Sequence, residues 1–203
     1  MQKINSFILK HLKKFKLLVW LLCLTPLALL VYAGFNDGLG ANPVEFITRY
    51  TGKYALIFLC ITLTITPFRK ITNLSSFLRF RRILGLFTFF YALIHFTIWF
   101  WLDHSLDLNE MLKDVYKRPF ITVGFAGFLL LICLAATSFN KAIKLMGKNW
   151  QKLHYSIYVI AGLALLHYYW IKSSKNNFSD FYIYAGILAI LAAYRIVAYL
   201  KKK

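Results

Sequence analysis

The sequence WQKLHYSIYVIAGLALLHYYW, residues 150–170, is apolar and aromatic over nearly its whole length, yet it holds two histidines, His154 and His167. Most of the stretch between them is long and apolar enough for a helix that crosses a bilayer, whose hydrocarbon core is about 30 Å thick. Ionisable side chains are costly inside such a span, and those that occur there usually have a function. The stretch therefore predicts a membrane helix with functional histidines.

The rest of the chain has the composition of a membrane protein. Of its 203 residues 60% are hydrophobic, and the mean hydropathy is +0.59. The segments between the apolar runs are too short for a soluble domain. We therefore expect an all-α membrane protein, a six-transmembrane-helix bundle that forms a single transmembrane domain over residues 1–203. The apolar runs predict membrane spans at residues 17–34, 54–68, 83–102, 119–138, 155–171 and 181–200.

The net charge of +18 is distributed in a way that predicts the orientation of these spans. On one side of a six-span chain lie most of the basic residues, in segments 1–16, 69–82, 139–152 and 201–203, whereas all seven acidic residues fall on the other side. Because cytoplasmic loops are enriched in Lys and Arg, both termini are expected to be cytoplasmic. The same loop pattern argues for membrane lipid and against nucleic acid as a partner.

Two of the five histidines are expected at the same depth in the membrane. His95 lies twelve residues after Ile83 in the third span, and His167 lies twelve residues after Tyr155 in the fifth. Both spans run outward, so at 1.5 Å per residue each imidazole lies roughly 18 Å from the cytoplasmic end of its span. Two imidazoles at one depth on two helices can ligate opposite faces of a haem iron. The pair therefore predicts a b-type haem site.

The third histidine of this group, His154, is expected at the cytoplasmic mouth, about 20 Å along the helix from His167. On an ideal helix the two side chains point about 140° apart, so they need not address one ligand unless the helix is kinked or underwound. A single intramembrane histidine can also simply hydrogen-bond to a neighbouring helix. Zinc is a weaker candidate than haem, because no carboxylate or cysteine joins the histidines at their depth. His11 and His104 lie in polar segments, where a lone histidine usually needs no special explanation.

Two further groups of residues can be interpreted in two ways. Arg79, Arg81 and Arg82 precede the third span and satisfy the positive-inside rule, but they also lie where haem propionates, a flavin phosphate or a quinone head group would need a cation. Arg82 is therefore a candidate for cofactor binding. Glycines within the spans are expected at close contacts between helices, and the last of them could also let a porphyrin approach the backbone: Gly85, Gly124, Gly127 and Gly162.

Several segments in combination resemble one family. The loop motif G-A-N-P-V, the span start R-R-x-L-G-L and the span W-Q-x-L-H…H-Y-x-W are specific when they occur together. The chain resembles the MsrQ (YedZ) family of haem-binding membrane subunits, within the ferric-reductase-like transmembrane superfamily. The matching stretches are LGANPVEFITRYTGKYAL at 39–56, LTITPF at 63–68, RRILGLFTFFYALIHFTIW at 81–99, KRPFITVGFAGFLLLICLAATS at 117–138 and WQKLHYSIYVIAGLALLHYYW at 150–170.

This resemblance implies a multi-pass electron conduit in the bacterial cell inner membrane. Members of the family take electrons from the quinone pool or a cytoplasmic flavin reductase and pass them through haem b. The acceptor is a periplasmic molybdopterin-containing catalytic subunit, which reduces methionine sulfoxide in oxidised periplasmic proteins. Members are also described as binding FMN. The family's histidines correspond to His95, His154 and His167, while Arg82 stands where the wider superfamily often has a fourth.

The residues themselves agree with a conduit that works between two partners. The sequence has no G-x-G-x-x-G fingerprint and no soluble catalytic domain, so we expect an electron-transfer subunit of an oxidoreductase system rather than its catalytic subunit. The alternative is a small proton- or metal-translocating transporter that uses the intramembrane histidines. Such a transporter predicts inverted repeats and acidic residues at the midplane, and neither is visible in the sequence. A membrane anchor or assembly factor without a cofactor is the third hypothesis.

Overall fold

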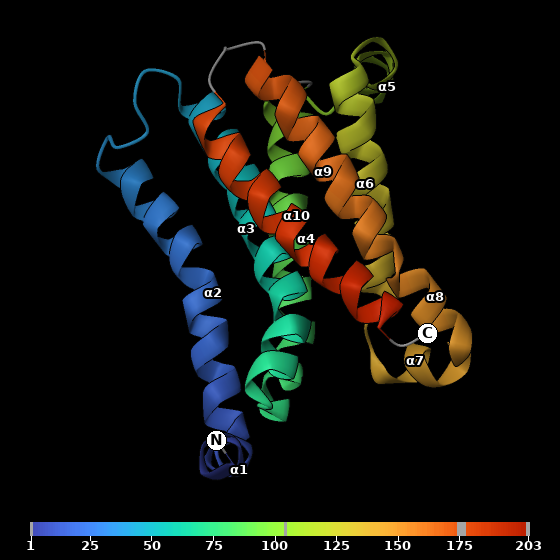
Figure 1. The fold of residues 1–203 in the computed structure, drawn as a ribbon. Helices are drawn as coiled ribbons and strands as arrows, with labels where there is room; N and C mark the ends of the chain where they lie inside the picture. Colours follow the sequence, from blue (N-terminus) through green and yellow to red (C-terminus); the bar gives the residue numbers. More distant parts are fainter. Residues whose placement is uncertain (1, 104, 174–177, 202–203) are drawn as a thin grey trace. The chain divides into compact units, whose positions relative to one another are not determined.

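The computed structural model describes residues 2–103, 105–173 and 178–201 (Figure 1). Within these residues it contains helices, turns and loops but no β-strand, which confirms the all-α fold. His104 lies outside the described residues. The elements are α1 (Gln2–Lys10), α2 (Leu12–Phe35), α3 (Pro43–Thr72), the 3₁₀ helix η1 (Ser75–Arg79), α4 (Arg81–Ile98), the π-helical segment η2 (Trp99–Asp103), α5 (Leu108–Lys117), α6 (Pro119–Ala136), α7 (Asn140–Met146), α8 (Lys148–His154), α9 (Ser156–Ser173) and α10 (Ser179–Leu200).

Five helical segments of the described chain are long and apolar enough to cross a membrane: α2, α3, α4 together with η2, α6 and α10. They agree with a multi-pass membrane protein. Helix α9, on the predicted fifth span, has 18 residues but is not among the five. Its histidine, tyrosines and tryptophan lower the mean hydropathy of the helix. The count of six spans and the orientation of the termini therefore stay predictions.

Helix α3 is longer than the apolar run 54–68 from which the second span is predicted. It begins at Pro43, and the side chain of Asn42 accepts a hydrogen bond of 3.1 Å from the backbone N–H of Glu45. Asn at the N-cap and Pro at the first helical position both favour a helix start. The charged residues of the first turns interrupt the apolar pattern, so hydropathy alone places the boundary too late.

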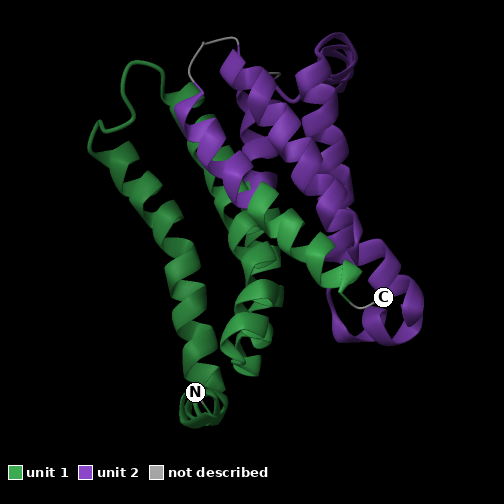
Figure 2. Cartoon of the chain, viewed as in Figure 1, with its two compact units in different colours: residues 1–91, 189–203 green, residues 92–188 purple. Residues whose placement is uncertain are grey.

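The chain forms two compact units, residues 1–91 with 189–203 and residues 92–188 (Figure 2). Helices α4 and α10 each contribute residues to both units. His95, His154 and His167 all belong to the second unit, whereas Arg82 belongs to the first. The single transmembrane domain expected over the whole chain stays a prediction.

Tyr91 lies at the centre of the first unit, where its side chain is 0% exposed and its ring stacks on Phe58 at 5.2 Å between ring centres. Its hydroxyl accepts a hydrogen bond from the backbone N–H of Leu27 (3.1 Å) and donates one to the carbonyl of Cys23 (2.9 Å). These two backbone groups pair with each other in an undistorted helix. The tyrosine hydroxyl therefore bridges the backbone of α2 beside Pro26, where the proline disturbs the helix.

Replacing Tyr91 with Phe removes this bridge and leaves the ring in place. We expect the free energy of unfolding to fall by about 2 kcal/mol, because a buried N–H and a buried carbonyl each lose a partner. The midpoint of thermal unfolding in detergent measures the loss. Tyr32→Phe is the matched control, since Tyr32 lies on α2, the helix whose backbone Tyr91 bridges, and is 65% exposed. Equal stability of the Tyr91→Phe variant and the parent protein would contradict the bridging role.

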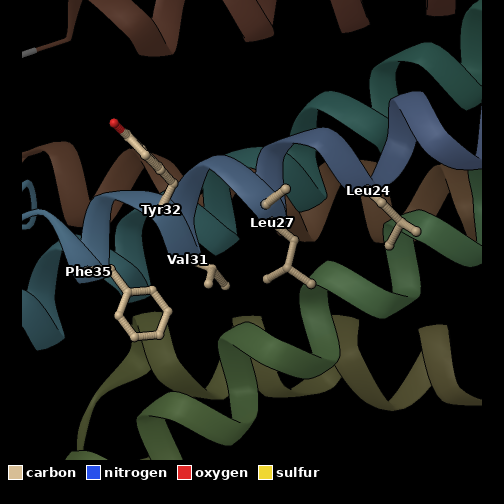
Figure 3. Close-up of a pocket in the computed structure, with 6 residues that line it drawn as sticks. Leu24, Leu27, Val31, Tyr32 and Phe35 are labelled. Carbon is tan, nitrogen blue, oxygen red and sulfur yellow. The ribbon is translucent and has the colours of Figure 1, made fainter.

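The second half of α2 presents an apolar strip with a shallow, open groove (Figure 3). Several of its side chains are largely exposed, and Phe35 is the most exposed of them. Exposed apolar side chains on a membrane helix suit contact with lipid. The residues that line the groove are Leu24, Leu27, Ala28, Val31, Tyr32 and Phe35.

Candidate functional site

Helices α6 and α9 lie side by side in the second unit (Figure 1). The Nδ1 atom of His167, on α9, lies 2.7 Å from the carbonyl oxygen of Phe120 in the first turn of α6. A carbonyl only accepts hydrogen bonds, so Nδ1 carries the proton in this contact. The lone pair of the neutral imidazole is then on Nε2, which is the atom available to bind a metal.

Gly124 of α6 makes room for the His167 ring. A Cβ atom added to Gly124 would lie 2.7 Å from Nδ1 and 2.9 Å from Cε1 of that ring. Such distances are far inside van der Waals contact, so any larger residue must displace the imidazole. The close contact expected at Gly124 is therefore with the candidate ligand itself. At Gly162 a Cβ would meet nothing within 4 Å, so the close helix packing expected there is wrong.

His95 comes from α4, and its ring centre lies 6.2 Å from that of His167 with the ring planes at 83°. Both side chains are half-buried. His95 is within one turn of the end of α4 at Ile98, and the partner of His167 is in the first turn of α6. The structure thus brings together the two histidines for which the sequence predicts equal depth, near the ends of α4 and α6 that are predicted to face the periplasm.

The separation of the two rings fits imidazoles on opposite sides of one metal ion. Each ring centre would lie one ring radius plus a metal–nitrogen distance of about 2.0–2.1 Å from a shared metal, so two opposed ring centres would lie roughly 6 Å apart. The observed 6.2 Å agrees with this value. His95 and His167 would be the two protein ligands of a haem held here, which would supply a redox-active iron. The described residues contain no group of three or more His, Cys, Asp or Glu side chains that could hold a metal ion.

Aromatic side chains lie near the histidine pair. Phe96, next to His95, stacks on Phe128 of α6 with ring centres 4.6 Å apart and planes at 18°. The ring of Phe120 lies 6.3 Å from that of His167. An apolar surrounding limits access of water to a metal and tunes its redox potential. The π-helical segment η2 begins one turn after His95, and such segments are frequent at functional sites.

His154 lies at the other end of α6. It is the last residue of α8, and a turn at Tyr155 separates it from α9. Its ring stacks on that of Trp150 at 3.9 Å, and the indole N–H of Trp150 donates a hydrogen bond of 2.8 Å to the carbonyl of Thr137, which caps α6. At 1.5 Å per residue, Phe120 and Thr137 are roughly 25 Å apart along α6. His154 therefore lies at a different level of the second unit from the His95–His167 pair.

The environment of His154 shows a role for Trp150 that sequence reasoning missed. The His154 Nδ1 lies 3.1 Å from the backbone carbonyl of Trp150, and its Nε2 is buried. The stacked indole and its hydrogen bond to α6 fix the position of this imidazole. The signal in the sequence was the spacing of four residues between Trp150 and His154, which places two side chains on one face of a helix.

Arg82 lies in the first turn of α4, in the first unit, and its side chain is exposed. The preceding helix η1 is held by α1, because the side-chain oxygen of Asn5 accepts a hydrogen bond of 2.8 Å from the backbone N–H of Ser76. The Asn5 amide also donates to the hydroxyl of Ser75 at 3.2 Å. These bonds position the basic segment that leads to Arg82, which remains a candidate for binding an anionic group.

Known proteins resemble this chain along most of its length. Residues 51–165 match the family described as ferric reductase like transmembrane component. Three relatives are each named protein-methionine-sulfoxide reductase heme-binding subunit MsrQ. The one from Polaromonas naphthalenivorans (strain CJ2) is 50% identical over 89% of this chain and 83% of its own, and the one from Herminiimonas arsenicoxydans is 52% identical over 89% and 84%. The one from Bordetella pertussis is 46% identical over 94% and 92%. No solved structure matches the chain.

Proposed function

Because the chain belongs to the MsrQ family, within the ferric reductase like transmembrane components, we propose that it is the haem-binding membrane subunit of a protein-methionine-sulfoxide reductase. In this proposal it holds haem b between His95 and His167 and transfers electrons, while a partner carries out the catalytic reduction. The observation that supports it most is the pair of imidazoles, whose ring centres lie 6.2 Å apart. The Nδ1 of His167 bonds to the carbonyl of Phe120, so its Nε2 is the atom available to a metal.

The location of the pair suggests the direction of transfer. It lies near the ends of α4 and α6 that are predicted to face the periplasm, so electrons would leave there. The acceptor is a periplasmic molybdopterin-containing catalytic subunit that repairs oxidised periplasmic proteins. The donor is the quinone pool or a cytoplasmic flavin reductase. Six spans, cytoplasmic termini and a place in the bacterial inner membrane complete the proposal.

Each residue of the site has a separate task in this proposal. The haem supplies a one-electron carrier when it is bound. His95 and His167 hold it from two sides, and the carbonyl of Phe120 orients His167 and increases the donor strength of its Nε2. Gly124 leaves the space in which that ring lies. Arg82 is proposed as the cation for a haem propionate, a quinone head group or the phosphate of FMN.

A reduced-minus-oxidised optical spectrum of the purified protein tests the proposal. We expect an α-band of b-type haem in the reduced protein. A colourless preparation that takes up no haem on reconstitution would reject the proposal. If that preparation is stable, the outcome would favour the third hypothesis, a membrane anchor or assembly factor without a cofactor.

Replacing His154 with Ala is expected to leave most of the haem absorbance in place, because His154 lies about 20 Å along the helix from His167. Instead, the variant should be reduced more slowly by a cytoplasmic-side donor, or should lose a separate centre at that end. Haem content and the anaerobic reduction rate measure the two effects. Trp150→Phe should reproduce part of the defect, since it removes the bond to Thr137 and keeps a stacking ring. Complete loss of haem from His154→Ala would contradict the separation of the two sites.

A further inference from the structure

Helix α10 carries an arginine within the predicted span 181–200. Arg195 is half-buried, and a charged side chain inside a span is costly unless it has partners. Its Nη1 donates a hydrogen bond of 2.7 Å to the carbonyl of Leu191 in its own helix. Its Nη2 donates to the carbonyl of Leu63 in α3. All three residues belong to the first unit.

The carbonyl of Leu63 differs from its neighbours in α3 because of Pro67. In a regular helix the N–H of residue 67 donates to the carbonyl of residue 63. Proline has no N–H, so Pro67 leaves the Leu63 carbonyl without its helical donor. Leu63 is 4% exposed, and an unsatisfied carbonyl is costly in the membrane. Arg195 donates to the same carbonyl that the proline leaves open.

We propose that Arg195 is a positioning residue that acts through this carbonyl. Its guanidinium replaces the N–H that Pro67 lacks and fixes α10 to α3 at the proline. The end of α3 that follows Pro67 carries Arg69 and Lys70 and leads through η1 to α4. Arg195 thereby holds this basic end of α3 relative to α10. The inference does not depend on the haem, because it concerns contacts within the first unit.

The other proline within a long helix of the described chain has a comparable arrangement. Beside Pro26 of α2, the Tyr91 hydroxyl bridges two backbone groups, and the hydroxyl of Tyr50 donates a hydrogen bond of 2.9 Å to the Pro26 carbonyl. Side chains from neighbouring helices thus bond to the helix backbone at both prolines. Only at Pro67 is the donor a charged group.

A double-mutant cycle tests the pairing of Arg195 with Pro67. Arg195→Leu is expected to lower the midpoint of thermal unfolding in detergent by roughly 3–6 °C, since it leaves a buried carbonyl without a donor. Pro67→Ala restores an N–H at residue 67. In the Pro67→Ala background, Arg195→Leu should therefore lower the midpoint by much less. Arg195→Lys keeps the charge but loses the forked geometry, so its effect should be intermediate.

Pro26→Ala is the matched control, because it also removes a proline from a membrane helix of the first unit. It should leave the effect of Arg195→Leu unchanged. If Arg195→Leu lowers the midpoint of thermal unfolding equally in the parent and Pro67→Ala backgrounds, the proposal is overturned. Loss of haem from Arg195→Leu without a change in that midpoint would also overturn it. If Arg195→Leu alone does not fold, recovery of folded protein with Pro67→Ala but not with Pro26→Ala supports the pairing. Failure of both double variants to fold overturns it.

Discussion

Replacing either His95 or His167 with Ala is expected to lower the haem content of the purified protein by at least about tenfold. In the proposed site each substitution removes one of two ligands, and a single remaining imidazole would hold a haem much more weakly. The haem-to-protein ratio and the α-band of the reduced protein measure the loss. Equal effects are expected at the two positions, because the ring centres lie 6.2 Å apart as a pair.

The control for this experiment is His11→Ala, since His11 lies between α1 and α2, in the first unit. It should keep the full haem content. Circular dichroism and size-exclusion chromatography establish that the variants fold, so that a loss of haem is not a loss of structure. If His95→Ala, His154→Ala and His167→Ala all lose the haem completely and equally, the assignment of the pair is wrong.

Replacing Gly124 with Ala has the second largest expected effect, although Gly124 is not a ligand. The added methyl group would lie 2.7 Å from Nδ1 of His167, so the ring must move away from α6. The hydrogen bond from Nδ1 to the carbonyl of Phe120 would then break, and with it the orientation of Nε2. Loss of such a supporting contact typically lowers metal affinity about 10–100-fold. Haem titration of the haem-free protein measures this change.

Gly127→Ala is the matched control, because it makes the same chemical change one turn further along α6. There the added Cβ would lie 3.7 Å from the Cβ of Leu163, which is an ordinary contact. Both substitutions raise the helix propensity of α6 by a similar amount, so that effect cancels in the comparison. Gly127→Ala should bind haem as the parent protein does. Equal affinities of the two variants would show that space at Gly124 is not required.

The pairing of His95 with His167 could be predicted from the sequence because depth in a membrane helix is a count of residues. Two spans that start at the same side and carry histidines at equal distances from their starts bring those side chains to one level. The contacts that orient the pair could not be predicted. The partner of His167 is the backbone carbonyl of Phe120, and a backbone atom has no residue type that a pattern can identify.

Other features depended on tertiary contacts in the same way. The sequence predicts the fifth span at residues 155–171 with His154 at its mouth, and the structure places His154 at the end of a separate short helix, α8, before α9 begins at Ser156. The bond from Trp150 to Thr137 at the end of α6 holds this short helix. The hydrogen bond from Arg195 to the carbonyl of Leu63 could not be predicted from the sequence either, because it joins residues far apart in the chain. The sequence identifies Trp150 and Arg195 as unusual residues, but only the packing of the helices shows which backbone groups they bond to.

Electron paramagnetic resonance of the oxidised protein tests the central claim most directly, because the spin state of ferric haem reports both axial ligands. We expect a low-spin signal typical of two imidazole ligands. The signal should be lost in His95→Ala and His167→Ala, and it should return when free imidazole is added to either variant with haem. A high-spin signal in the parent protein, or an unchanged low-spin signal in His167→Ala, would contradict the claim that these two histidines hold one haem between them.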